Sequence, residues 1–167
     1  MPDLMILVLW AATAALLLTA VWHDVVLRII PNRVPFLIAV LGLLLRAAEG
    51  QLLVSLPLAA AVFIVGALCW RQGFLGGGDV KLLAACVLML PPGASAAFLL
   101  TTALAGGVLA AVYIALGRLP SRLFIELPGR TLAARIWRIE RQRIREGGPL
   151  PYACAICAGA VVTACGS

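Results

Sequence analysis

Six apolar runs dominate this chain of 167 residues and exclude most ways of folding in water. The runs extend over residues 4–22, 34–48, 52–70, 80–90, 94–116 and 150–165, with short polar or Pro/Gly segments between them. The residues are 63% hydrophobic and only 12% charged, whereas a soluble domain carries about a quarter charged residues, so we exclude a cytosolic enzyme and a DNA-binding protein. The composition predicts helices that span a lipid bilayer.

Basic residues favour one orientation of these runs across the bilayer. If all six runs cross, twelve of the thirteen Lys and Arg residues lie on one side and only Arg46 lies on the other. The run over residues 80–90 rises only about 16 Å, which is short against a hydrocarbon core of roughly 30 Å. If this run failed to cross, however, the Arg-rich segment that follows would lie outside, against the positive-inside rule. We therefore expect six crossings with both termini outside, in a single integral-membrane domain over residues 1–167.

The segment over about residues 118–148 is the one clearly soluble piece of the chain. It holds eight of the thirteen basic residues, so the net charge of +6 is local and does not indicate a nucleic-acid partner. One helical face would carry Leu132, Ile136, Trp137 and Ile139, and the other Arg135, Arg138, Arg141 and Arg145. This pattern predicts an amphipathic cytoplasmic helix that rests on anionic lipid headgroups.

Two carboxylates, Asp24 and Asp79, stand out because a charge inside the bilayer is costly and is therefore a candidate for function. The six-crossing topology puts both at the cytoplasmic boundary, although 55 positions separate them. Two carboxyls that share one proton can hydrolyse a peptide bond, because one takes a proton from water while the other donates to the substrate carbonyl. Intramembrane acids also mark ion pathways, so a small proton- or cation-coupled transporter or channel subunit is the alternative.

Three glycines precede Asp79, in the sequence Gly76-Gly77-Gly78-Asp79-Val80-Lys81. A backbone without side chains lets an extended substrate lie close and is free to adopt positive φ. The alternative is a flexible turn that ends in an Asp capping the next helix. Lys81 either favours the ionised form of Asp79 or extends to lipid headgroups. No G-x-x-x-x-G-K-[ST] motif is present, so we expect no nucleotide site.

Asp24 begins a second polar patch that continues through Arg28 to Pro31 and Asn32. The Pro-Asn pair predicts a turn before the second run begins. An Asp and an Arg four residues apart at a helix end are common neighbours, so a simple Asp24–Arg28 pair at the membrane surface is the alternative to a functional role.

The five cysteines indicate neither a disulfide framework nor a metal site. All of them lie in or beside apolar runs, as small core residues do. Cys154 and Cys157 form a C-x-x-C pair, but no second pair exists and His23 is the only histidine. Because the usual ligands of a zinc ion are missing, we expect no metal and no other cofactor.

Three patches together resemble the type IV prepilin peptidases, members of the GxGD class of membrane aspartic proteases that includes presenilin. The first patch is Gly76-Gly77-Gly78-Asp79-Val80-Lys81-Leu82, which resembles the family's G-x-G-D-x-K-L signature. The second is Asp24 with Arg28 and Ile30-Pro31-Asn32, which is similar to the family's first-aspartate motif. The third is Pro151-Tyr152-Ala153 followed by Ala155-Ile156 and Gly159, which resembles the P-Y-x-x-A-I-x-x-G segment of the last span.

The resemblance implies an all-α polytopic membrane protein, a bundle of about six transmembrane helices, that acts as an aspartic-type endopeptidase. It assigns catalysis to Asp24 and Asp79. The substrate-binding and active-site loops would comprise Gly76, Gly77, Gly78, Lys81, Arg28, Pro31 and Asn32. The implied substrates are prepilins with a short basic leader, a cleavage site after Gly and an apolar helix beyond it, and the implied location is the bacterial cytoplasmic (inner) membrane.

One departure from the longer members of the family affects the expected activity. Those members carry a cytoplasmic region with paired C-x-x-C motifs and an added N-methyltransferase activity, whereas the first run here begins at about Leu4. The chain resembles the short, peptidase-only branch associated with Flp-type, tight-adherence pilins, so we expect no methylation. A structural pilus-assembly subunit without catalytic activity is a further alternative.

Overall fold

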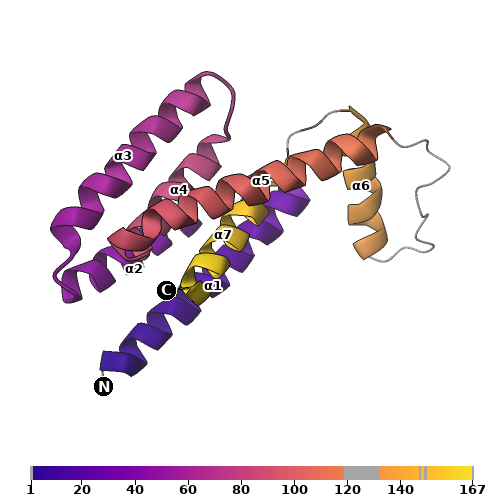
Figure 1. Cartoon of the computed structure of the whole chain (residues 1–167). Coiled ribbons are helices and arrows are strands. Elements are labelled where there is room, and N and C mark those ends of the chain that lie inside the picture. Colours follow the sequence, from indigo (N-terminus) through magenta and orange to yellow (C-terminus); the bar gives the residue numbers. More distant parts are fainter. Residues whose placement is uncertain (1, 119–131, 147, 149, 167) are drawn as a thin grey trace.

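The structure is a computed structural model that describes residues 2–118, 132–146, 148 and 150–166, and all regular structure in these ranges is helical. In chain order the helices are α1 (Pro2–Leu27), α2 (Arg33–Ala48), α3 (Leu52–Arg71), α4 (Gly77–Met89), the short η1 (Pro92–Ala94), α5 (Ser95–Arg118), α6 (Leu132–Glu146) and α7 (Tyr152–Gly166) (Figure 1). The predicted all-α class is therefore confirmed.

Each predicted apolar run coincides with one helix, and the largest difference concerns the first run. The sequence places the end of that run at Trp22, whereas α1 continues to Leu27. The residues that follow Asp24 are apolar and prolong the helix until Arg28, whose positive φ of 56° cannot continue an α-helix. Asp24 therefore lies inside the last turns of α1 and not in a loop after it.

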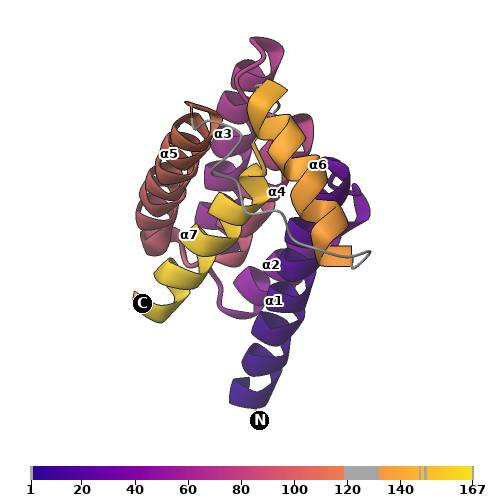
Figure 2. The ribbon, with the colours of Figure 1, turned by 90° about the vertical axis from the view of Figure 1, so that its right-hand side faces the viewer.

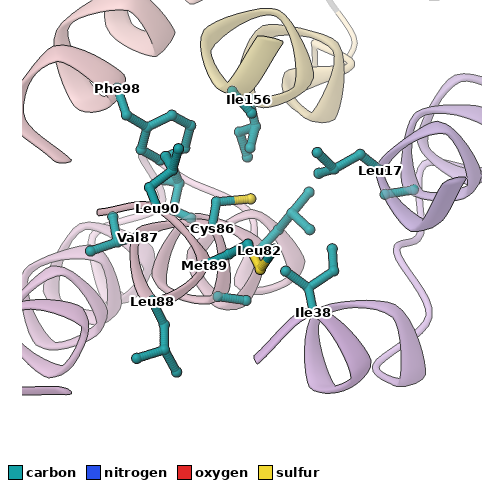
Figure 3. Packing of buried hydrophobic residues seen from close by; sticks show 14 of the residues in the cluster. Leu17, Ile38, Leu82, Cys86, Val87, Leu88, Met89, Leu90, Phe98 and Ile156 are labelled. Atoms are coloured by element: carbon teal, nitrogen blue, oxygen red, sulfur yellow. The ribbon is translucent and has the colours of Figure 1, made fainter. Parts of the chain in front are cut away.

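Helix α4 forms the centre of the bundle, although with 13 residues it rises only about 20 Å. It packs against α2, α3 and α7, so that protein covers most of its surface. Figure 3 shows its side chains converging with Leu17 of α1, Ile38 of α2, Phe98 of α5 and Ile156 of α7. Because its neighbours bury it, a helix this short does not have to match the thickness of the lipid by itself.

Small residues let the helices of this bundle approach one another closely. A Cβ added at Gly42 of α2 would lie 2.8 Å from the backbone nitrogen of Met89, so α2 and α4 meet through their backbones. Gly66 of α3 similarly accommodates the side chain of Val80, and Gly159 of α7 accommodates the backbone and hydroxyl of Thr102. Such contacts are typical of helices that associate in lipid, where close packing replaces the hydrophobic effect.

Three described helices, over Leu4–Leu27, Leu52–Arg71 and Pro92–Arg118, are long and apolar enough to cross a membrane. Their outward faces carry large apolar side chains, and Leu7, Leu53 and Leu104 are more than half exposed. Lipid as the surrounding solvent explains this exposure, and the fold is that of a polytopic membrane protein. The number of crossings stays a prediction for α2, α4 and α7, which are shorter.

Helices α1 and α7 run antiparallel, so the two ends of the chain lie at the same end of the bundle (Figures 1 and 2). Helix α6 lies at the opposite end, beside the end of α5 and the C-terminal end of α1. The helix predicted within the basic segment is thus confirmed as α6. The rest of that segment, with Arg122, Glu126 and Arg130, lies outside the described residues.

The backbone contact at Gly42 makes a testable prediction about stability. We expect Gly42→Ala to force α2 and α4 apart and to lower the free energy of unfolding by about 1–3 kcal/mol. Gly107→Ala is the matched control, because a Cβ there meets nothing within 4 Å. Unfolding in detergent micelles measures both variants, and equal stability of the two would contradict the packing described here.

Candidate active site

A cavity of about 650 Å³ lies between the end of α1, the start of α4, and the helices α5 and α7. The polar side chains in its wall are those of Asp24, Arg28, Asp79 and Tyr152. The other lining residues are Gly73, Phe74, Leu75, Gly76, Ala103, Gly106, Gly107, Ala110 and Leu150. Two acids that are far apart in the sequence thus line one cavity, and their carboxyl groups are near enough to interact electrostatically.

Asp24 is held in place from the opposite side of the bundle. Its side chain is buried, with 6% of the residue exposed, and its Oδ2 accepts a hydrogen bond of 3.0 Å from the backbone N–H of Ala153. Ala153 lies in the first turn of α7, where backbone N–H groups have no partner within their own helix. The contact therefore satisfies a donor of α7 and fixes the acid of α1 at the same time.

Asp79 is the third residue of α4, and its carboxylate lies against the start of that helix. It is close to the backbone of Gly76, the residue before the helix, and interacts with the Gly76 N–H electrostatically. Its Oδ1 is buried and has no hydrogen-bond partner among the described residues. The capping role considered from the sequence stays a prediction, because no side-chain hydrogen bond caps the start of α4.

The three glycines before Asp79 serve different purposes. None has positive φ, so close approach and not backbone conformation explains them. A Cβ at Gly76 would lie 2.6 Å from Asp79 Oδ2, one at Gly78 would lie 3.1 Å from Ile30, and one at Gly77 would lie 3.3 Å from Trp70. Only Gly76 lines the cavity, whereas Gly77 and Gly78 begin α4 and face neighbouring side chains. The expected glycine strip is thus reduced to one residue.

Pro31, Asn32 and Lys81 lie beside the cavity and connect the elements around it. Lys81 Nζ donates a hydrogen bond of 2.9 Å to Asn32 Oδ1, which joins the start of α2 to α4. The carbonyl of Pro31 accepts from the N–H of Val34 in the first turn of α2. Both interpretations of Lys81 made from the sequence stay predictions, and the structure adds a contact of its ammonium group with the Pro-Asn turn.

Arg28 lines the cavity, but its ion pair is not with Asp24. Its guanidinium binds Glu140 of α6, which also accepts hydrogen bonds from Tyr113 of α5 and Arg143. The simple Asp24–Arg28 ion pair considered from the sequence is therefore replaced by a contact between two distant segments. Sequence reasoning missed Glu140 as a site residue, although an acid four residues from both Ile136 and Ile144 on the apolar face of a basic helix is a usable signal.

The chemistry available in this cavity is that of a carboxyl pair. Two neighbouring carboxyls with one proton between them provide a general base and a general acid. The residues of α5 in the wall of the cavity, Ala103, Gly106, Gly107 and Ala110, are all small. Within the described residues, no group of three His, Cys, Asp or Glu side chains is placed as metal ligands would be, and Cys154 and Cys157 are free thiols.

Comparison with known proteins gives two matches. Residues 11–111 match the protein family described as the type IV leader peptidase family. Prepilin peptidase EppA of Methanothermobacter thermautotrophicus is 38% identical over 79 residues, which make up 43% of this chain and 20% of that protein. The match thus spans a fifth of the length of that relative. No solved structure gives a significant match.

The hydrogen bond between Asp24 and Ala153 predicts a difference between two substitutions. Asp24→Asn keeps an oxygen that can accept from the Ala153 N–H, whereas Asp24→Leu leaves this buried donor unpaired. We expect the Leu variant to be less stable than the Asn variant by about 1–3 kcal/mol in detergent unfolding. A Leu variant as stable as the Asn variant would contradict a role of this bond in holding α1 to α7.

Proposed function

We propose that this chain is a membrane aspartic endopeptidase that removes the leader of type IV prepilins. The reason is that the chain belongs to the type IV leader peptidase family. The proposal rests on one observation above all: Asp24 and Asp79 reach the same cavity from different helices. Each acid lies within the segment that matches the family. An interfacial salt bridge or a helix cap would explain either acid alone, but neither explains why the two share one cavity.

In the proposed reaction, one carboxylate takes a proton from a water molecule as the water oxygen attacks the carbonyl carbon of the scissile peptide bond. The other carboxyl donates its proton to the carbonyl oxygen, which gives a neutral tetrahedral diol. When the C–N bond breaks, a hydroxyl of the diol gives its proton to the ionised carboxylate. The protonated carboxyl gives its proton to the departing nitrogen. The Asp79 carboxylate in the wall of the cavity supports this proposal, because its Oδ1 has no hydrogen-bond partner among the described residues.

The proposed substrate is a prepilin of the Flp type, with a short basic leader, a Gly before the cleaved bond and an apolar helix after it. The cavity supports an extended segment of chain at the cleavage site, since Gly76 and the small residues of α5 keep side chains out of its walls. A substrate helix has to unwind near its Gly before the peptide bond can reach two carboxyls. Gly76, Arg28 and the neighbouring Pro31, Asn32 and Lys81 are proposed to shape this site.

We further propose that the cavity opens at the cytoplasmic face of the inner membrane and that both termini lie outside. The basic helix α6 supports this orientation, because it lies at the cavity end of the bundle and cytoplasmic loops are rich in Arg. Arg135, Arg138 and Arg145 are exposed on α6, which suits contact with anionic headgroups.

The proposal predicts that Asp24→Asn and Asp79→Asn each abolish cleavage while the protein stays folded. Loss of one member of a general acid–base pair lowers turnover by about a hundredfold or more. Cleavage of a co-expressed Flp-type prepilin in membranes, followed by mass spectrometry at matched expression, measures this effect. Glu49→Gln is the control, because it makes the same chemical change beside Arg46, away from the cavity. Cleavage by both Asn variants, or ion flux without any cleavage by the unchanged protein, would contradict the proposal.

Gly107 offers a second test that leaves both acids intact. It lines the cavity, and a Cβ there meets nothing within 4 Å, so the side chain of Gly107→Leu starts in open space. We expect this variant to fold normally and to lose most cleavage, because its side chain occupies the place of the substrate. Ala111→Leu is the control, since Ala111 is exposed on the same helix and does not line the cavity. Full activity of Gly107→Leu would place substrate binding elsewhere.

A further inference from the structure

Three helices meet at the carboxylate of Glu140 on the basic helix α6. Arg28 at the end of α1 and Tyr113 of α5 both donate to Glu140 Oε1, and Arg143 Nη1 donates to Oε2 at 3.2 Å. The side chain of Glu140 is only 12% exposed and that of Arg28 only 10% exposed. Attraction to lipid does not explain why an acid of this basic helix is largely buried beside two arginines.

The backbone at Arg28 indicates that its side chain is needed where it lies. Arg28 is the one non-glycine residue with positive φ in the described part of the chain. Glycine is the residue that this left-handed position after a helix favours, because other residues are strained there. The chain instead has an Arg whose backbone N–H donates 2.9 Å to the carbonyl of Asp24 and whose guanidinium binds Glu140.

A second contact ties α6 to the same turn of α1. Arg143 Nη1 donates to the carbonyl of Val25 at 2.9 Å, and its Nη2 donates to the carbonyl of Val26 at 3.3 Å. These carbonyls belong to the last turn of α1, where a helix has acceptors without partners and where a positive charge is favourable. Glu140 holds Arg143 in the orientation that these two bonds require.

We propose that Glu140 is a positioning residue for the Asp24 carboxyl. Through Arg28 and Arg143 it clamps the last turn of α1 and so fixes Asp24 in the cavity. Helix α6 is then part of the machinery of the site and not only an anchor on the membrane surface. This inference rests on the proposed function for one point, that Asp24 takes part in a reaction. The contacts of Glu140 with Arg28 and Arg143 do not depend on any substrate.

Hydrogen exchange tests the clamp without a substrate. The amides of Arg28 and Ala153 donate to the backbone carbonyl and the side chain of Asp24, so their exchange reports how firmly Asp24 is held. We expect Glu140→Gln to raise exchange in the segments containing these two amides by about tenfold. Glu49→Gln is the matched control, because Glu49 also pairs with a buried arginine, Arg46, at 2.7 Å and makes no contact with α1 that the structure records. It should leave both segments unchanged.

Cleavage kinetics provide the second measurement. If Glu140 positions Asp24, Glu140→Gln lowers kcat by about tenfold or more, because small displacements of a reacting group are costly, while KM changes by less than about twofold. Arg28→Gly suits the left-handed backbone but removes the guanidinium, so it should reproduce the increased exchange at Ala153. Its kinetics do not count here, because Arg28 also lines the cavity. If Glu140→Gln does not give folded protein, the exchange at Ala153 in Arg28→Gly decides the question.

The inference is overturned if exchange at Ala153 stays unchanged in both variants, or if Glu49→Gln raises it equally through general loosening. It is also overturned if only KM changes, because Glu140 would then affect substrate binding and not position Asp24. Failure of the unchanged protein to cleave any prepilin would reject the proposed function, and the exchange measurement would still decide whether Glu140 holds the end of α1.

Discussion

Two carboxyl groups at one end of an apolar bundle, that of buried Asp24 and that of half-buried Asp79, impose the main constraint on this structure. A buried acid is costly unless neighbouring groups donate to it, and the donor to Asp24 comes from another helix. The Ala153 N–H of α7 donates to Asp24 of α1, whereas Asp79 lies against the start of its own helix, α4. The position of α1 relative to α7 is thus coupled to the placement of Asp24.

Close packing through small residues makes this arrangement possible. Glycines at the crossings of α2 with α4 and of α5 with α7 bring backbones together where any side chain would separate them. Gly76 applies the same principle to the site itself, because its missing side chain is what lets the Asp79 carboxylate fold back on the start of α4. The sequence Gly-Gly-Gly-Asp therefore combines packing and access to the cavity within four residues.

The sequence was sufficient to predict the all-α class and the helix positions, because hydropathy acts locally along the chain, whereas the roles of Asp24 and Asp79 stay predictions. The sequence was not sufficient to predict the surroundings of Gly77 and Gly78. Gly77 lies against Trp70 and Gly78 against Ile30, and these contacts depend on how the helices pack. The partner of Arg28 could not be read from spacing either. Asp24 is four residues away and Glu140 is 112 residues away, yet Arg28 binds the distant acid. Only the folded chain shows that α6 lies against the end of α1.

The central claim is that Asp24 and Asp79 act as one pair with one proton, and the pH dependence of kcat/KM for purified protein in lipid vesicles tests it most directly. A pair that must supply both a base and an acid gives a bell-shaped profile, in which activity falls when both carboxyls are protonated and when both are ionised. The account predicts this profile in the unchanged protein. It also predicts that the pH profile of any residual activity in either Asn variant has lost one of its two limbs. Activity that rises with pH to a plateau and keeps that form in both Asn variants would contradict the pair and require another catalytic group.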